Sequence, residues 1–253
     1  MAFPKLLLSN ITKVYPHAQQ LVLDTVSFHV NKGEFVSIIG PSGCGKSTLF
    51  HLISGIESQT TGDISFAGEK IRERKGKVGY MFQNSLLLPW RSVLNNLLLG
   101  TDIRHIPHTL ARKQAVTMLE KFGLASYMHA YPAILSGGMK QRVALLRTML
   151  FHQDLLLLDE PFGALDALTR LSCQLWLLEV WKQVRSSIVF ITHDIREAIL
   201  LSDRIYVMSK RPGRIIGEFS VGLQRPRKPE ALQSRQAIML EKKLFTLLAH
   251  EQV

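Results

Sequence analysis

Short apolar runs separated by turn residues organise the beginning of the chain. Residues 6–14 and 21–30 predict two short strands, the second of them with alternating apolar and polar side chains. A turn is expected at Asn31–Glu34. The run Phe35–Ile39 that follows is almost wholly apolar, which is typical of a strand buried on both of its faces.

Helical and strand-like patterns alternate farther along the chain. Ser47–Ile53 predicts a helix, a turn is expected at Gly62-Asp63, and Lys77–Phe82 predicts another strand. From about residue 92 to about residue 151 the spacing of apolar positions is helical, most clearly in Ala111–Phe122.

Three further elements complete the pattern. Leu155–Leu158 and Ile188–Thr192 are short apolar runs that predict strands, and Ala167–Val184 between them predicts a helix. Because strands alternate with helices, the sequence predicts an α/β fold built on a parallel, wound sheet. The helical block ahead of Leu155 is then an inserted α-helical subdomain, which we place at about residues 85–152.

The composition changes after Phe219, so we divide the chain into a main domain, residues 1–220, and a C-terminal part, residues 221–253. The run Arg225–Pro229 predicts an extended linker. Beyond it, apolar residues recur at helical spacing and predict an amphipathic helix (Ala237, Leu240, Leu244 and Leu247). We favour docking of this helix on the chain's own core over contact with a membrane or a partner.

The composition and charge of the chain limit the classes of protein to which it can belong. The chain has 253 residues, 46% of them hydrophobic and 20% charged, as in an ordinary globular domain. Its formal net charge of +11 can attract polyanions, but the basic residues are scattered, which favours a solvated surface over a nucleic-acid site. No apolar run approaches the ~18–20 residues of a membrane span. We therefore expect a cytoplasmic protein that reaches a membrane only through a partner.

The segment Gly40–Ser47 fits the phosphate-binding P-loop pattern in full and lies between a predicted buried strand and a predicted helix. Glycines let the backbone N–H groups face phosphate oxygens, and the following helix points its positive end at the same place. Lys46 is expected to reach the β- and γ-phosphates, and the Ser47 hydroxyl to ligate Mg²⁺. The sequence therefore predicts binding of a nucleoside triphosphate.

Two adjacent carboxylates, Asp159 and Glu160, end the aliphatic run Leu155–Leu158. In α/β sheets ligands bind at the carboxyl ends of the strands. We expect Asp159 to hold the Mg²⁺ shell and Glu160 to polarise an attacking water as general base. A strand followed by Asp-Glu is common, and only its pairing with the upstream P-loop makes this interpretation strong.

A third motif indicates which family of nucleoside-triphosphate-binding proteins the chain resembles. Leu135–Gln141, which reads LSGGMKQ, opens a predicted helix, and Ser136, Gly137 and Gly138 form a second helix N-terminus suited to an anion. This segment resembles the signature of the ATP-binding-cassette (ABC) family, and the resemblance covers the chain to about residue 220. It implies a P-loop NTPase fold, with a RecA-like parallel core sheet, an antiparallel β subdomain and the inserted helical subdomain.

The resemblance also implies roles for single residues. Gln83 matches the Q-loop glutamine that contacts Mg²⁺ and water, His193 the switch histidine that senses the γ-phosphate, and Asp166 the D-loop. Tyr15 matches, by spacing alone, the aromatic residue that stacks on adenine. The expected ATP-binding residues are Tyr15, Gly40, Pro41, Ser42, Gly43, Cys44, Gly45, Lys46, Ser47 and Thr48, the expected catalytic residues are Glu160, His193 and Gln83, and the expected Mg²⁺ ligands are Ser47, Gln83 and Asp159.

The resemblance also implies a mechanism and partners, which we state here as expectations. Two copies dock head to tail and trap ATP between the P-loop of one and Ser136–Gly138 of the other. Closure moves integral-membrane permease subunits, and a periplasmic or surface binding protein delivers the solute. The chain is then expected as a peripheral protein on the cytoplasmic face of the bacterial inner membrane.

Several details resemble importer subunits for nitrate, sulfonate, taurine and pyrimidine precursors of thiamine. They are Leu86–Trp90, Met139, the run Asp159–Arg170 and the segment Arg211–Ile216. The apolar Leu86–Trp90 patch is expected to receive the permease, with burial in the core as the alternative. A soluble ABC ATPase acting on nucleic acid or ribosomes is the rival function, but such proteins usually carry two cassettes or a long coiled coil. An inactive cassette is disfavoured by the intact Lys46 and Glu160.

Overall fold

A six-stranded sheet forms the centre of the molecule, in the strand order β10-β9-β3-β8-β7-β6. The computed structural model describes residues 3–15, 19–70, 73–105, 107–150, 154–184 and 186–251. Strands β6, β7, β8, β3 and β9 are parallel, and β10 runs antiparallel to β9 at one edge. The strands span β3 Phe35–Ile39, β6 Gly79–Met81, β7 Leu155–Asp159, β8 Ser187–Ile191, β9 Arg204–Met208 and β10 Ile215–Ser220.

The parallel strands are apolar at nearly every position because both faces of the sheet are covered. In β7, Leu155 and Leu157 join the hydrophobic cluster on one face, whereas Leu156 and Leu158 join the cluster on the other. Strand β8 repeats this alternation. The continuous apolar runs of the sequence therefore belong to buried strands, as expected.

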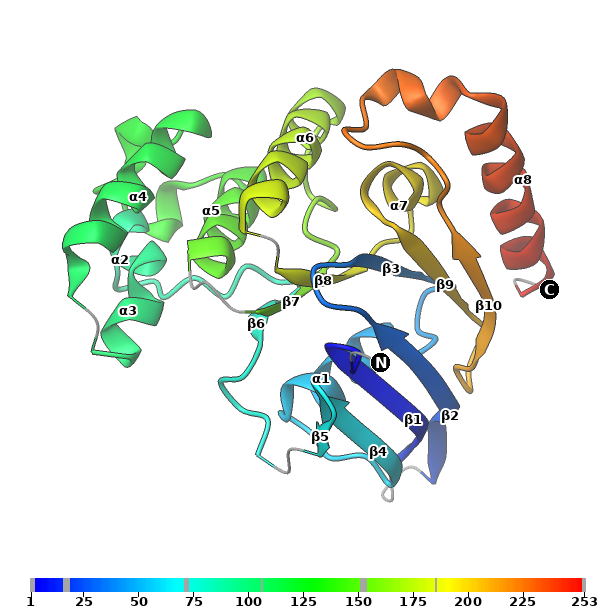
Figure 1. Ribbon diagram of the computed structural model, residues 1–253. Helices are drawn as coiled ribbons and strands as arrows, with labels where there is room; N and C mark the ends of the chain where they lie inside the picture. Colours follow the sequence, from blue (N-terminus) through cyan, green and yellow to red (C-terminus); the bar gives the residue numbers. More distant parts are fainter. Residues whose placement is uncertain are drawn as a thin grey trace.

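A four-stranded antiparallel sheet and helix α1 (Lys46–Ser54) cover one face of the central sheet (Figure 1). Its order is β2-β1-β4-β5, and its strands span β1 Leu6–Tyr15, β2 Gln20–Val30, β4 Thr61–Phe66 and β5 Glu69–Lys70. The expected strands at residues 6–14 and 21–30 are therefore confirmed.

The turn expected at Gly62-Asp63 is wrong, because both residues lie inside β4. Gly62 has a φ of 89°, and a Cβ atom there would lie 2.4 Å from the carbonyl oxygen of Asn10 in the neighbouring strand. The pairing of β1 with β4 shifts register between Ser9 and Thr12. Gly62 therefore marks an irregularity where two backbones approach closely, a role that glycine also has within strands.

Helices α2 to α5 lie together between β6 and β7 in the chain and form the left-hand lobe of Figure 1. They share a hydrophobic cluster with α6 and with the other face of the central sheet. The helices span α2 Val93–Leu97, α3 Leu99–Ile103, α4 His108–Lys121, α5 Gly137–Leu150 and α6 Ala167–Val184. The last of these has the predicted bounds. Residue 151, at the end of the predicted helical stretch, is outside the described residues.

The C-terminal helix α8 (Arg235–His250) docks on the chain itself. Its Ala237 and Leu244 are fully buried in a cluster with β9 and with α7 (Ile195–Leu201). Figure 1 shows α8 beside α7 and β10, with the short turn Pro229–Gln233 leading to it. The predicted docking of this helix on the core is confirmed.

The segment expected as a linker is irregular but firmly attached. The Arg227 side chain is only 1% exposed and donates to the carbonyl oxygens of Ile199, Val221 and Leu223 at 3.1–3.2 Å. Burial lowers the pKa of its guanidinium to about 10, so it remains charged at neutral pH. Because five backbone carbonyls, those of Leu200 and Ser202 included, accept hydrogen bonds from this buried cation, Arg225–Pro229 does not behave as a free linker.

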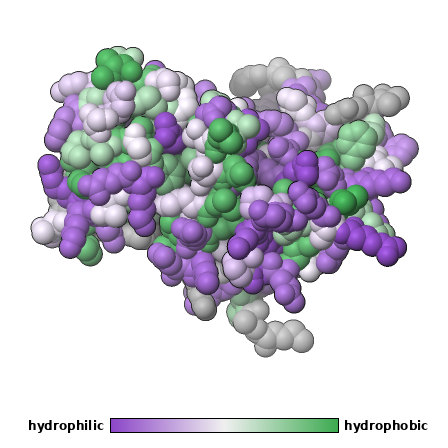
Figure 2. All heavy atoms as spheres, turned by 90° about the horizontal axis from the view of Figure 1, so that it is seen from above, coloured by the Kyte–Doolittle hydropathy of each residue, from purple (hydrophilic) through white to green (hydrophobic). Residues whose placement is uncertain are grey.

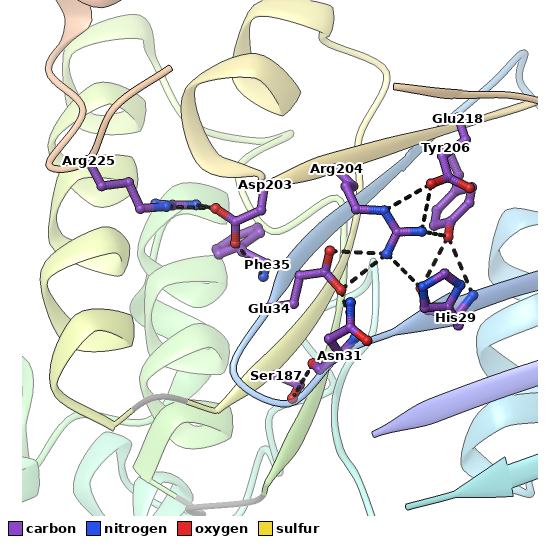
Figure 3. Close-up of polar contacts among 10 residues, drawn as sticks. All are labelled: His29, Asn31, Glu34, Phe35, Ser187, Asp203, Arg204, Tyr206, Glu218 and Arg225. Atoms are coloured by element: carbon purple, nitrogen blue, oxygen red, sulfur yellow. Dashed lines mark hydrogen bonds and ion pairs between the residues drawn. The ribbon is translucent and has the colours of Figure 1, made fainter. Parts of the chain in front are cut away.

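A polar network ties this segment to the edge of the central sheet (Figure 3). Asp203 accepts a hydrogen bond of 2.8 Å from Arg225. Beside it, Arg204 on β9 donates to Glu34 at 3.0 Å and to Glu218 on β10 at 2.8 Å. These bonds join the turn before β3, the strands β9 and β10, and the C-terminal segment.

Hydrophilic side chains interspersed with hydrophobic ones cover the face seen from above in Figure 2. Within the described residues, the structure contains no helix with the length and hydrophobicity needed to cross a bilayer.

Candidate functional site

A cavity of about 340 Å³ opens at the carboxyl edge of the parallel strands. Loops after all of these strands contribute to it, which is where open α/β sheets bind ligands. Most of its lining comes from the P-loop after β3 and from the start of α1. The lining residues are Gly40, Ser42, Gly43, Gly45, Lys46, Ser47, Thr48, Gln83, Glu160, His193 and Arg211.

The P-loop has the backbone that phosphate binding requires. Gly43 and Gly45 have φ angles of 73° and 108°, which place them in a region that side chains disfavour. Helix α1 begins at Lys46, and no side chain caps its N-terminal N–H groups. The Lys46 ammonium donates to the carbonyls of Gly40 and Pro41, each at 2.8 Å, and so lies across the loop. Free N–H groups and a cation therefore converge on one anion-binding hollow.

Asp159, at the end of β7, is buried and hydrogen-bonded to the Ser47 hydroxyl. Burial raises the pKa of its carboxyl, the Ser47 bond opposes this, and the neighbouring Glu160 carboxylate raises it further. A carboxylate and a hydroxyl beside a phosphate site fit the ligand set of a magnesium ion bound with nucleotide. Gln83 lines the same cavity, and its side chain carries an amide oxygen of the kind that also ligates this ion.

Glu160 has an unusual backbone for a residue with a side chain, with a φ of 46°. Its N–H donates to Ile191 at 3.0 Å, and its carbonyl accepts bonds from Gln141 and Gly163. Such conformations cost about 1–3 kcal/mol and persist only where the surroundings enforce them. The result is that the Glu160 carboxylate points into the cavity, 3.4 Å from Nδ1 of His193.

Tyr15 does not line this cavity. Its hydroxyl donates to Glu57 at 2.7 Å and also bonds the Thr48 side chain. Burial raises the pKa of this phenol, and Glu57 adds to the effect. The Lys13 ammonium lies 4.7 Å from the ring centroid. Tyr15 is therefore adjacent to the site through Thr48, and its stacking on adenine stays a prediction.

Ser136, Gly137 and Gly138 also lie outside the cavity, at the exposed start of α5. The Ser136 hydroxyl accepts a bond of 3.3 Å from the Met139 N–H. Nothing lies within 4 Å of a Cβ atom placed on Gly137, so this side of the helix end is open. The structure thus contains a second accessible helix N-terminus that the P-loop of the same chain does not use.

Asp166 is exposed and immediately precedes helix α6. Its carboxylate accepts a bond of 3.1 Å from the Thr169 N–H, and this hydrogen bonding holds its pKa below the usual value. Helix capping accounts for these contacts. A role for Asp166 at an interface between two copies stays a prediction.

Gln141 contacts the loop that carries Glu160, and it was not among the site residues expected from the sequence. It is buried on α5, where its amide N–H donates to the Glu160 carbonyl at 2.9 Å and its amide oxygen accepts from the Ala164 N–H at 3.0 Å. The helix that carries the exposed Ser136 therefore bonds directly to the loop that carries Glu160. Gln141 bonds to the Glu160 backbone and does not line the cavity, so we expect any effect of it on hydrolysis to pass through Glu160.

Replacing Gln141 is expected to slow hydrolysis more than it weakens nucleotide binding. Gln141→Ala removes both bonds, so the strained Glu160 backbone relaxes, and kcat should fall about tenfold while the ATP dissociation constant changes less than about twofold. Gln141→Glu keeps the acceptor for Ala164 and loses the donor to Glu160, so it should resemble Gln141→Ala. Steady-state kinetics and equilibrium binding measure both effects. A Gln141→Glu variant with unchanged kcat contradicts this positioning role.

Arg211 was not expected in the site, yet it lines the cavity. It follows β9, which pairs with β3 on the side opposite β8. The apolar run Ile205–Met208 is the signal that identifies this strand, and a loop after a parallel strand next to the P-loop is placed to reach the site.

Comparisons with known proteins agree with this geometry. The sequence model of a family described as ABC transporter matches residues 23–163. The bicarbonate transport ATP-binding protein of Synechocystis sp. is 43% identical over 88% of this chain and 80% of that protein. The aliphatic sulfonates import ATP-binding protein of Bacillus cereus is 42% identical over 81% of each chain. The nitrate import ATP-binding protein of Synechococcus elongatus is 42% identical over 86% of this chain and 80% of that protein.

A solved structure resembles the whole fold. A dimeric ATP-binding cassette bound to ADP and phosphate, in a post-hydrolysis state, superposes with a TM-score of 0.78 and is 29% identical. The match covers 87% of this chain and 100% of that one.

Proposed function

The chain belongs to the ABC transporter family, and we propose that two copies of it hydrolyse ATP at a shared interface to drive import of a small oxyanion or sulfonate. As a member of that family it is an ATPase subunit coupled to transport. The observation that carries the proposal is the single cavity in which the P-loop, Glu160 and His193 meet.

The residues that line the cavity have different roles in ATP hydrolysis. The P-loop N–H groups and Lys46 bind and orient the phosphates. Glu160 accepts a proton from the attacking water, and His193, within 3.4 Å, orients that carboxylate and contacts the terminal phosphate. Gln83, which lines the same cavity, orients the water together with Glu160. Ser47, Asp159 and Gln83 would hold a magnesium ion, which would supply electrostatic stabilisation of charge on the transferred phosphoryl group.

A second copy completes the site. Each chain offers one exposed helix N-terminus at Ser136–Gly138 that lies outside its own cavity. In a head-to-tail pair, that N-terminus faces the nucleotide bound to the other chain, where its N–H groups meet the γ-phosphate. The dimeric cassette that this chain resembles supports such an arrangement. Within each chain, the bonds of Gln141 connect the signature helix to Glu160.

The permease surface is the loop Leu86–Trp90. Leu86 and Trp90 are 54% and 71% exposed, although both are large and apolar. The loop is nevertheless well fixed: Arg147 donates to the Leu86 carbonyl at 2.8 Å, and the buried Asn96 bonds both the N–H and the carbonyl of Leu88. A rigid loop that exposes apolar side chains is suited to receive a partner.

Truncating this surface is expected to uncouple the chain from its permease. Trp90→Ala should weaken co-purification with the permease at least about tenfold, because central aromatic anchors often contribute 2 kcal/mol or more to an interface. ATP hydrolysis by the isolated chain should stay within about twofold of wild type. Phe245→Ala removes an equally exposed aromatic side chain from α8 and serves as the control. Loss of hydrolysis with intact permease association would contradict this role of Trp90.

The solute class is proposed from the three relatives, whose names specify nitrate, bicarbonate and aliphatic sulfonates. All three solutes carry an oxyanion group. The chain itself contacts neither the solute nor its path, because it works as a peripheral subunit on the cytoplasmic face of the inner membrane. A separate binding protein outside the membrane delivers the solute to the permease.

Isolation of the intact complex tests the proposed function. A tagged copy of the chain, purified from detergent-solubilised membranes, should bring with it a permease and show ATP hydrolysis that depends on Mg²⁺. The associated binding protein should then bind nitrate, bicarbonate or a sulfonate in a thermal-shift screen. Binding of a pyrimidine precursor instead would overturn the oxyanion class, and co-purification of ribosomes or nucleic acid without a permease would overturn the transport role.

A further inference from the structure

The loop Ser209–Arg214 packs directly against the P-loop. The Gly213 N–H donates to the Val22 carbonyl at 2.8 Å, and its carbonyl accepts from Asp24 at 3.0 Å. A Cβ atom on Gly213 would lie 2.3 Å from the Cys44 carbonyl oxygen, so only glycine allows this approach to the P-loop. The loop is therefore held against the site by its own backbone.

A buried hydroxyl fixes the shape of the same loop. Ser209 donates from its side chain to the carbonyls of Lys210 and Pro212, at 2.8 and 3.1 Å, and accepts from the Arg214 N–H at 3.0 Å. Its own N–H donates to the Arg214 carbonyl at 2.9 Å. The hydrogen bonds of Ser209 therefore fix the backbone of the loop that carries Arg211.

The two arginines of this loop have different surroundings. Arg214 points away from the cavity and donates from Nε to Asp24 at 2.8 Å. Arg211 lines the cavity, and it makes no hydrogen bond or ion pair with any residue in the described part of the chain. A guanidinium without a partner beside an anion-binding loop is matched chemically to a phosphate, which it binds through two parallel N–H donors.

The position of Arg211 along the cavity is indicated by its neighbours. Its charge acts on the phenol of Tyr15, whose hydroxyl bonds the Thr48 side chain. Arg211 lines the cavity together with Thr48, and it therefore lies on the side of the cavity next to Tyr15.

We propose that Arg211 is a nucleotide-binding residue that contacts the α- and β-phosphates, which ATP and ADP share. This proposal rests on the proposed function of the cavity and adds to it a cation from outside the P-loop. It also gives the segment Arg211–Ile216, which the sequence singled out, a physical role: Gly213 permits the close approach, and Arg211 makes the contact.

Equilibrium binding of ATP and of ADP to the full chain tests this role. Arg211→Ala should weaken both nucleotides by about tenfold, as expected for loss of a charge-assisted hydrogen bond. Arg211→Lys should retain part of the affinity, since a lysine supplies a point charge without the paired donors. Lys210→Ala is the matched control, because it removes the same charge from the adjacent exposed residue, which does not line the cavity.

The outcomes separate this proposal from the proposed function. If the wild-type chain binds neither ATP nor ADP, the function of the cavity is wrong. If the wild type binds both and Arg211→Ala binds ADP within twofold of wild type, Arg211 is not a ligand of the shared phosphates. A loss confined to ATP, or one equal to that of Lys210→Ala, also contradicts the proposal. A shallower salt dependence of ADP binding in Arg211→Ala supports it, because a phosphate contact is ionic.

Discussion

Glu160→Gln is expected to lower ATP hydrolysis by about 10²–10⁴-fold, the range that general-base catalysis contributes. The substitution keeps the size and backbone of the residue and removes only the carboxylate that takes the proton from water. Nucleotide binding should be retained, because the P-loop and Lys46 supply it, and loss of a negative charge from the cavity does not oppose a polyphosphate. Release of inorganic phosphate and equilibrium binding of ATP measure the two effects.

Glu179→Gln is the matched control, since Glu179 is exposed on α6 and outside the cavity. It should hydrolyse ATP at the wild-type rate. If Glu160→Gln also hydrolyses at that rate, Glu160 is not the base, and another group in the cavity activates the water.

Lys46→Ala is expected to weaken ATP binding by about 30-fold or more. The Lys46 side chain is buried across the mouth of the P-loop, and truncating a buried partner of a charged pair costs about 2–5 kcal/mol. Hydrolysis should be lost together with binding, unlike in Glu160→Gln. Isothermal titration with ATP and Mg²⁺ measures the affinity.

Lys70→Ala provides the control for this variant, because Lys70 lies on the exposed strand β5, where it pairs with Asp63 at the surface. Thermal unfolding of Lys46→Ala shows whether loss of its bonds to the Gly40 and Pro41 carbonyls disturbs the fold. A folded Lys46→Ala protein with unchanged ATP affinity contradicts the assignment of the P-loop.

The central sheet was largely predictable because its strands are buried on both faces. Such strands are continuously apolar, so Phe35–Ile39 and Leu155–Leu158 stand out in the sequence, and the chemical motifs follow directly after them. The strand Arg204–Met208 has the same character but was not singled out. The site was consequently expected without the loop that carries Arg211.

Contacts between distant segments were not predictable from local patterns. Gln141 is a polar residue on the buried side of a helix, and its partners Glu160 and Ala164 follow a strand much later in the chain. Likewise, Arg225–Pro229 has the proline content of a linker, whereas Arg227 is buried against carbonyls of α7 and its neighbours. In both cases tertiary hydrogen bonds, which no spacing rule encodes, decide the role.

Spacing alone was also a weak guide to Tyr15. The aromatic residue lies close to the P-loop, as expected, but its hydroxyl bonds Glu57 and it is not among the residues that line the cavity. By contrast, the residues placed by a motif together with a preceding strand, Gln83, Glu160 and His193, all line it. Position at the carboxyl end of a parallel strand was therefore the more informative signal.

The mass of the Glu160→Gln chain in solution tests most directly the claim that two copies share the site. With ATP and Mg²⁺, light scattering should give twice the mass of one chain, because ATP is trapped between the P-loop of one copy and Ser136–Gly138 of the other. With ADP, or after the further change Ser136→Glu, which places a negative charge against the γ-phosphate, the mass should be that of a single chain. A protein that binds ATP at saturating concentration and keeps the mass of one chain would contradict the account.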